Sequence, residues 1–103
     1  MNKIIDLNCA YLNKSIRTTE EYWQKIINIK HPSIKGHEKQ VINTLANPDE
    51  IRKSIKDKDV YLYYKNSDKK YLCVIVKILN GEGFIITVYF TAKIKEGVVI
   101  WKK

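Results

Sequence analysis

The spacing of hydrophobic residues changes near residue 60 of the chain. Before this point, apolar side chains recur every three or four positions in two stretches. The first stripe consists of Tyr22, Trp23, Ile26, Ile27 and Ile29, and the second of Val41, Ile42 and Leu45. A period near 3.6 residues predicts amphipathic helices. We therefore expect helices over residues 19–30 and 37–46.

Local signals set the limits of these helices. Thr18 stands three residues before Glu21, which is the spacing of a capping box at a helix start. Pro32 ends the first helix because the residue before a proline is pushed out of the α conformation. The sequence 47–50 closes the second helix and is expected to open a further turn, with residues 51–54 on it or just after it. Residues 2–7 are expected to form a short first strand.

From residue 60 onward the chain is rich in β-branched and aromatic residues separated by turn sequences. This pattern predicts strands over residues 60–65, 71–79, 84–92 and 98–101, with a glycine-containing hairpin loop at 80–83. Helices followed by strands indicate an α+β fold in two layers. We expect N-terminal helices packed on a four-stranded antiparallel β-sheet, in a single domain that spans residues 1–103.

The strand at residues 84–92 is expected to present two different faces, because side chains alternate along a strand. One face is apolar and is expected to pack on the helices: Ile86, Val88, Phe90 and Ala92. The other carries three hydroxyls: Ile85, Thr87, Tyr89 and Thr91. Hydroxyls suit phosphate and sugar oxygens, and tyrosine can stack on an unpaired base. The alternative is that these are good strand residues on a solvated face. In the strand at 60–65, Tyr61 and Tyr63 are expected on one side, with Leu62 and Tyr64 on the other.

The formal charge indicates which classes of partner the protein could bind. The chain has 19 Lys and Arg against 11 Asp and Glu, a net charge of +8. Residues 60–103 contain eight of the basic side chains but only three acidic ones. Such an excess favours a nucleic acid, an anionic membrane face or an acidic protein as partner. The alternative is a lysine-rich surface that only keeps the protein solvated.

Cysteine usage and hydropathy narrow the picture further. Cys9 and Cys73 lie far apart, with no CxxC pair, so a metal site is not expected, and buried free thiols are favoured over a disulfide. The start of the chain lacks the pattern of a secretion signal. Its longest apolar stretch, residues 84–90, is too short to span a bilayer. We therefore expect a protein that is cytoplasmic, or that another machine delivers into a cytoplasm, and that has no membrane partner.

Few side chains are candidates for chemistry. His31 stands at the expected end of the first helix, where a helix C-terminus favours its cation, and it could act as a general acid or base. His37 begins the second helix and ranks lower. Arg52, Lys53 and the adjacent Ser54 form a compact cationic group that suits a phosphate. For each of these residues, the alternative is an ordinary solvated surface.

The order of several short motifs resembles the barnase–EndoU–colicin–RelE superfamily, and most closely its phage-associated and toxin-like small nucleases. The resemblance covers about residues 20–95. The motifs are Trp23 and Ile26 before His31-Pro32; Val41 and Leu45 before Asn47-Pro48-Asp49; Ile51 and Ser54; Tyr63-Tyr64; and residues 84–89. One position departs from the pattern, because Ser33 stands where such proteins often carry a glutamate after His-Pro.

The resemblance implies metal-independent cleavage of RNA without a cofactor, in which the 2′-hydroxyl attacks the adjacent phosphate and leaves a cyclic phosphate. The implied catalytic residues are His31, Arg52, Thr87 and Tyr89. The implied substrate-binding residues are Lys53, Ser54, Tyr64, Lys65, Thr91 and Lys93. The resemblance also implies RNA as partner, with an acidic antitoxin or immunity protein as an inhibitor. The alternatives are a non-catalytic RNA-binding module of the same fold and an immunity or inhibitor protein.

Overall fold

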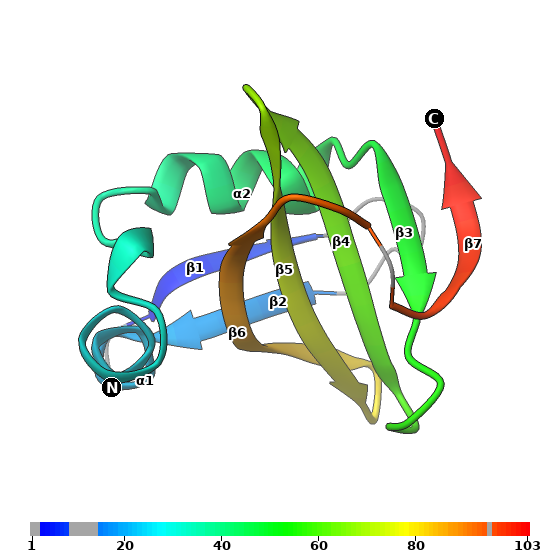
Figure 1. The fold of residues 1–103 in the computed structure, drawn as a ribbon. Coiled ribbons are helices and arrows are strands. Elements are labelled where there is room, and N and C mark those ends of the chain that lie inside the picture. The colour runs from blue at the N-terminus through cyan, green and yellow to red at the C-terminus, as the bar shows by residue number, and fades with distance from the viewer. Residues whose placement is uncertain (1–2, 9–14, 95) are drawn as a thin grey trace.

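The computed structural model of the protein describes residues 3–8, 15–94 and 96–103. The first half of the chain begins with two strands followed by the helical segments, and strands alone fill the second half (Figure 1). The elements are β1 (Lys3–Asn8), β2 (Ser15–Thr19), α1 (Glu20–Lys25), the π-helix η1 (Ile26–Lys30), the 3-10 helix η2 (Pro32–Ile34), α2 (Glu38–Ala46), β3 (Glu50–Lys53), β4 (Val60–Ser67), β5 (Lys70–Leu79), β6 (Glu82–Thr91) and β7 (Val98–Lys102).

All described strands join one sheet, in the order β1-β2-β6-β5-β4-β3-β7. Neighbouring strands are antiparallel except for β2 and β6, which run parallel. The expected α+β composition is present, but the expected four-stranded antiparallel sheet is wrong. The sheet is mixed and has seven strands among the described residues. It is larger because β1 and β2 extend one side and β3 is inserted on the other.

Strand β3 replaces the helical turn that was expected after residue 47. Its residues pair with β4, with Ile51 opposite Tyr63 and Arg52 opposite Leu62. Ile51 is fully buried in the core. Burial of this side chain between strands outweighs the local turn signal, because propensity is only a weak guide against tertiary packing.

Strand β7 lies at the opposite side of the sheet from the position that a simple meander predicts. It pairs with β3 and not with β6. The connection from β6 therefore crosses in front of β5 and β4 before β7 begins, as the orange segment in Figure 1 shows. Ile94, in this crossing segment, packs on buried side chains of β4 and β5. The crossing segment therefore covers part of one sheet face.

The helical segment after β2 is shorter and less regular than expected. Thr19, and not Thr18, caps α1, and its Oγ1 accepts a hydrogen bond from the backbone N–H of Tyr22 at 3.2 Å. The helix becomes π-helical at Ile26 and ends at Lys30, before Pro32. Helix α2 matches the expected position closely. α1 and α2 contribute Trp23, Val41 and Leu45 to the main core, which defines the covered face of the sheet.

A β-bulge in β6 changes the expected assignment of side chains to faces. Ile75 of β5 pairs with Thr87, and the next residue of β5 pairs with Ile85, so Ile86 is left over. Ile85 and Val88 both enter the main core, whereas Ile86 does not. The prediction that Ile86 shares the core face with Val88 is therefore wrong, because one extra residue shifts the alternation.

Two further sequence-based expectations can be compared with the fold. Cys73 is a buried free thiol, and Cys9 lies outside the described residues. Tyr63 belongs to the main core, whereas Leu62 and Tyr64 form a second cluster with Cys73 on the other face, so the expected split of the β4 side chains is confirmed. Within the described part of the chain, no helix is both long enough and apolar enough to cross a membrane.

Candidate functional site

Polar side chains collect in two cross-strand rows on the sheet face opposite the helices, which we call the open face. Register pairs place Glu50, Tyr64, Cys73 and Tyr89 in the first row, across β3, β4, β5 and β6. The same register places Arg52, Leu62, Ile75 and Thr87 in the second row. The predicted residues Arg52, Tyr64, Thr87 and Tyr89 therefore all belong to one face of the sheet.

The first row contains a hydrogen-bonded group of two tyrosines and a thiol. The thiol of Cys73 hydrogen-bonds with the side chains of Tyr89 and Tyr64. Burial raises the pKa of Cys73 from 9.0 to about 12, and burial is also the main cause that raises the pKa of each tyrosine. All three groups therefore remain protonated near neutral pH and act as hydrogen-bonding groups, not as bases.

His31 reaches this group from the side. It lies between η1 and η2, and its ring centroid is 5.5 Å from that of Tyr89, with the planes inclined at 35°. His37 lies on the covered side instead, edge-on to Phe90 with centroids 5.1 Å apart. The two histidines thus contact neighbouring residues of β6 that point to opposite faces, and only His31 belongs to the open face.

The edge of β6 beside His31 is held by polar contacts. The hydroxyl of Tyr22 donates to the carbonyl oxygen of Ile86 at 2.7 Å. Lys30 Nζ donates to the same carbonyl at 3.2 Å and to the Tyr22 hydroxyl at 2.9 Å. The next residue, Thr87, has a buried Oγ1 without a hydrogen-bond partner among the described residues. The ammonium of Lys30 and the imidazole of His31 are thus adjacent in sequence, and both lie beside the part of β6 that contains Thr87.

Arg52 lies at the far end of the second row. Three interstrand spacings separate its Cα from that of Thr87, which is about 14 Å. Its Nε donates to Oε2 of Glu50 at 2.5 Å, and its Nη1 is 3.5 Å from the carbonyl oxygen of Gly97. Glu50 is buried, and only 7% of its side chain is exposed. The guanidinium charge is therefore already offset by a carboxylate.

The remaining predicted binding residues are dispersed. Lys65 contacts the backbone oxygen of Asn47 at 2.7 Å and lies 3.7 Å from a carboxylate oxygen of Asp49, away from the open face. Lys53 is exposed and neighbours Arg52 on the strand, so it points to the opposite side. Neither lysine belongs to the two rows.

Hydroxyls near the ends of the site have local hydrogen bonds. Ser54 Oγ accepts from the backbone N–H of Asp57 at 3.1 Å. Thr91 Oγ1 donates to the carbonyl oxygen of Lys93 at 2.9 Å, which links the end of β6 to the crossing segment. Thr91 continues the open face beyond Tyr89, and Lys93 is exposed.

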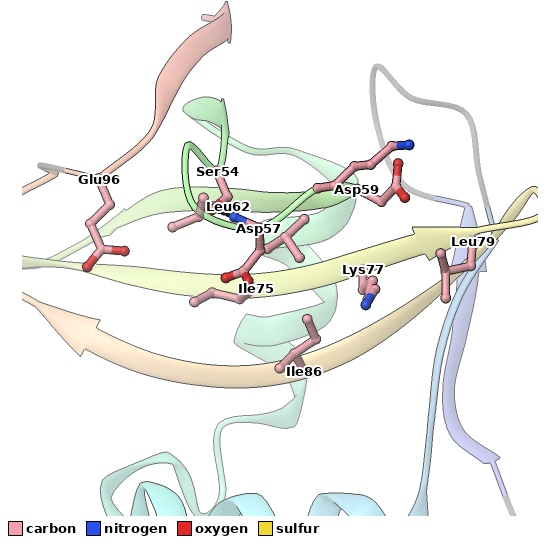
Figure 2. A pocket seen from close by; sticks show the side chains of 11 residues that line it. Ser54, Asp57, Asp59, Leu62, Ile75, Lys77, Leu79, Ile86 and Glu96 are labelled. Atoms are coloured by element: carbon pink, nitrogen blue, oxygen red, sulfur yellow. Dashed lines mark hydrogen bonds between the residues drawn. The ribbon is translucent and has the colours of Figure 1, made fainter.

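A groove of about 530 Å³ lies beside the second row. Figure 2 shows its apolar floor, formed by Leu62, Ile75 and Ile86. Three carboxylates border it: Asp57 and Asp59, from the loop after β3, and Glu96, from the crossing segment. Glu96 is exposed. Burial is the main cause of the raised pKa of Tyr89, and the negative charge of Glu96 raises it further. Glu96 therefore lies on the same face as the tyrosine pair.

The described residues do not form a group of three or more His, Cys, Asp and Glu side chains that could hold a metal ion.

Sequence reasoning did not select four residues that the structure places in or beside the site: Glu50, Cys73, Glu96 and Lys30. Glu50 is placed in the first row by the register of β3, which was not expected to be a strand. Cys73 is placed there by the register of β5 with β4 and β6. Lys30 has a local signal, since it precedes His31. Glu96 lacked a signal, because a turn residue reaches this face only when the chain crosses the sheet.

The scans of family models, curated proteins and solved structures give no match for this chain.

Proposed function

We propose that the protein is a metal-independent endoribonuclease, as the resemblance to the barnase–EndoU–colicin–RelE superfamily implies. The observation that supports it most directly is the position of His31 against Tyr89 on the open face, next to Thr87. This arrangement offers one proton-exchanging imidazole and hydrogen-bonding hydroxyls beside an accessible sheet surface. Those are the groups that transesterification of RNA uses.

In the proposed reaction, the 2′-hydroxyl of a ribose attacks the adjacent phosphorus and the 5′-oxygen leaves. His31 exchanges a proton with one of these two oxygens. Tyr89 donates a hydrogen bond to a non-bridging phosphate oxygen, and its protonated state suits this role. Lys30, whose ammonium lies at the edge of β6 beside this position, supplies positive charge to the transition state.

Arg52 takes a different part in this proposal. Its guanidinium is tied to Glu50 and Gly97 and lies on the far side of the face from His31. It would therefore contact a flanking phosphate of the bound strand, so that the RNA backbone runs across the sheet along the second row. The net charge of +8 supports binding of a polyanion.

A second candidate function is RNA binding without cleavage. The observation that favours it is the ion pair of Arg52 with Glu50, which leaves less positive charge for a pentacoordinate phosphate. A binding module would use the same tyrosines for stacking and hydrogen bonds. The nuclease proposal includes action on RNA in the cytoplasm. It also includes inhibition by an acidic antitoxin or immunity protein, which the positive charge of this chain would attract.

The test is incubation of total cellular RNA with the purified protein in EDTA, followed by analysis of the new RNA ends. We expect cyclic-phosphate ends from the wild type and a loss of rate of about 10²–10⁴ in His31→Ala. His37→Ala is the matched control, since it removes the histidine on the covered side, and it should cleave like the wild type. RNA that is bound at low salt but left intact, with or without ribosomes, would favour the binding module.

A further inference from the structure

Strands β2 and β6 separate soon after they meet. Their parallel pairing covers three residue pairs, and the last of these joins Arg17 to Phe84. Two residues later, β6 contains the bulge at Ile86, and a bulge bends the strand in which it occurs. Figure 1 shows β6 turning away from β2, while β2 runs on toward α1. Residues 18–19 and residues 85–86 therefore belong to neighbouring strands but do not pair with each other.

A cleft of about 570 Å³ lies where the two strands separate. We call it the β2–β6 cleft, and the residues that line it include Arg17, Thr18, Tyr22, Lys77, Phe84 and Ile86. Its volume is within the range of about 300–1,000 Å³ that is usual for small-molecule sites. It differs from the groove beside the second row, although Lys77 and Ile86 line both.

The walls of the β2–β6 cleft are mainly apolar, and other contacts hold them in place. Ile85 is buried in the main core, and Ile86 follows it in the lining. The ring of Phe84 is 37% exposed, and the guanidinium of Arg17 lies 4.9 Å from its centroid. The hydrogen bond of the Tyr22 hydroxyl to the carbonyl of Ile86 fixes the tyrosine ring against β6. The cleft therefore offers preformed apolar walls to a ring or a chain.

The charged side chains that line the cleft are positive. Arg17 and Lys77 are both present, and the described lining contains no carboxylate. Arg17 is already paired with Glu82 at 2.9 Å. Lys77 is exposed and has neither an ion pair nor a hydrogen bond with any residue that the structure describes. The neighbouring groove is bordered by three carboxylates, so it is this cleft whose charge favours an anion.

One hydroxyl in the wall of the cleft is not satisfied by the protein. Thr18 lines the cleft and is only 5% exposed. Its Oγ1 is buried and has no hydrogen-bond partner among the described residues. Buried polar groups in folded proteins almost always have such a partner. The protein therefore leaves a hydrogen-bonding group of the wall unused, which favours a ligand with a polar group over a purely apolar one.

We propose that the β2–β6 cleft binds a small amphipathic anion, with an apolar ring or chain between the strands and one carboxylate against Lys77. The apolar part covers the exposed ring of Phe84 and the side chain of Ile86, and the carboxylate lies beside the unpaired ammonium. Aromatic acids and short fatty acids share this chemistry. His31 and Tyr89 do not line the cleft, so binding here does not depend on ribonuclease activity.

The experiment is an amide NMR titration of the whole isotope-labelled chain with four probes. Two are carboxylates, naphthoate and octanoate, and two are their uncharged counterparts, naphthylmethanol and octanol. We expect saturable shifts of the amides of residues 17–19 and 84–86, and the tighter carboxylate tells whether a ring or a chain fits better. Each uncharged counterpart should bind about two- to fivefold more weakly, which is the range for an exposed ion pair.

Three variants separate the charge from the apolar walls. Lys77→Gln should lose about two- to fivefold in affinity for the carboxylates and nothing for the uncharged probes. Lys69→Gln is the matched control, because Lys69 is also exposed but lies in the turn between β4 and β5, outside the cleft. It should bind all four probes like the wild type. Phe84→Ala should weaken carboxylates and uncharged probes alike, since it removes apolar surface.

Several outcomes would overturn the proposal. Equal affinity for a carboxylate and its uncharged counterpart, or no effect of Lys77→Gln, would rule out recognition of an anion by Lys77. Shifts that do not saturate, or that spread over other surfaces, would rule out the site. Displacement of the carboxylate by an RNA oligonucleotide would assign the cleft to the RNA-binding surface. A protein that binds the carboxylates at the cleft but leaves RNA intact would end the ribonuclease proposal and support this one.

Discussion

Gly97 sets the close approach of the crossing segment to β3, and its substitution gives a test of the fold with internal controls. Its φ is +85°, and a Cβ at this position would lie 2.7 Å from the carbonyl oxygen of Lys53 and 3.0 Å from Cβ of Arg52. Gly36 and Gly81 have nearly the same φ, +85° and +81°, but a Cβ at either would meet nothing within 4 Å. An alanine would therefore meet the same backbone strain at all three positions, but it would meet a steric conflict only at Gly97.

The loss of folding free energy expected for each alanine variant has up to two contributions, one from backbone conformation and one from steric conflict. An alanine in the left-handed region costs about 1–2 kcal/mol at any of the three positions. At Gly97 the steric conflict with β3 adds about 1–3 kcal/mol, because backbone cannot move aside cheaply. For a domain of this size, 1 kcal/mol lowers the melting temperature by about 4–8 °C. We expect the melting temperatures of Gly36→Ala and Gly81→Ala to fall by about 5–15 °C, and that of Gly97→Ala to fall by at least about 5 °C more.

The assay is thermal unfolding followed by circular dichroism, with chemical denaturation to obtain free energies. Equal losses for Gly97→Ala and the two control variants would refute the argument that the crossing segment lies close to β3.

Two further perturbations act on the rows of the open face. The pKa of Cys73 is raised to about 12 in the folded protein, and those of Tyr64 and Tyr89 are raised as well, so the unfolded chain loses these protons first. The contribution of these groups to stability is therefore fully present below about pH 9 and is lost as the pH rises from 9 to 12. The melting temperature should fall over this range. In Cys73→Ala the fall between pH 9 and 10 should be smaller. Arg52→Leu strands the buried carboxylate of Glu50 and should cost about 2–4 kcal/mol in denaturant unfolding. The double variant with Glu50→Gln should recover most of that loss, and a double variant no more stable than Arg52→Leu alone would contradict the burial argument.

The sequence indicated the central strands well because their signals are local. β4, β5 and β6 each have a strong run of β-branched and aromatic residues, and each joins the next through a short turn. Asp68, Asn80 and Gly81 adopt positive φ at these turns, as such residue types allow. Hairpin pairing between consecutive strands follows directly from such patterns.

The missed strands depend on partners far away in the chain. β2 and β3 have only five and four residues and are largely polar, so neither has a clear pattern of its own. Each becomes a strand because it completes an edge of the central hairpins, with Ile16 and Ile51 buried against them. The sequences of β2 and β3 contain no local pattern that predicts their pairing with the central strands.

The candidate site was predictable in composition but not in arrangement. Thr87 and Tyr89 kept their expected face because the bulge at Ile86 precedes them. Arg52 and Lys65 were predicted as site residues because of their charge. In the structure Arg52 is paired with Glu50, and Lys65 lies near the carboxylate of Asp49. The pairing of a cation with a nearby acid depends on register, which a sequence pattern does not specify.

The parallel pairing of β2 with β6 has a consequence for how the molecule opens. Ser15 pairs with Glu82 and Arg17 with Phe84, so this contact closes a long loop that contains α1, α2 and the strands from β3 to β5. Loop closure of this length is slow and is completed late in folding. In native-state hydrogen exchange, the amides of β1 and β2 should therefore open at lower free energy than those of β4 and β5, which are joined by a tight hairpin. The helical segment that carries His31 follows β2 directly, so local opening of this edge would separate the imidazole from Tyr89 while the central sheet stays intact.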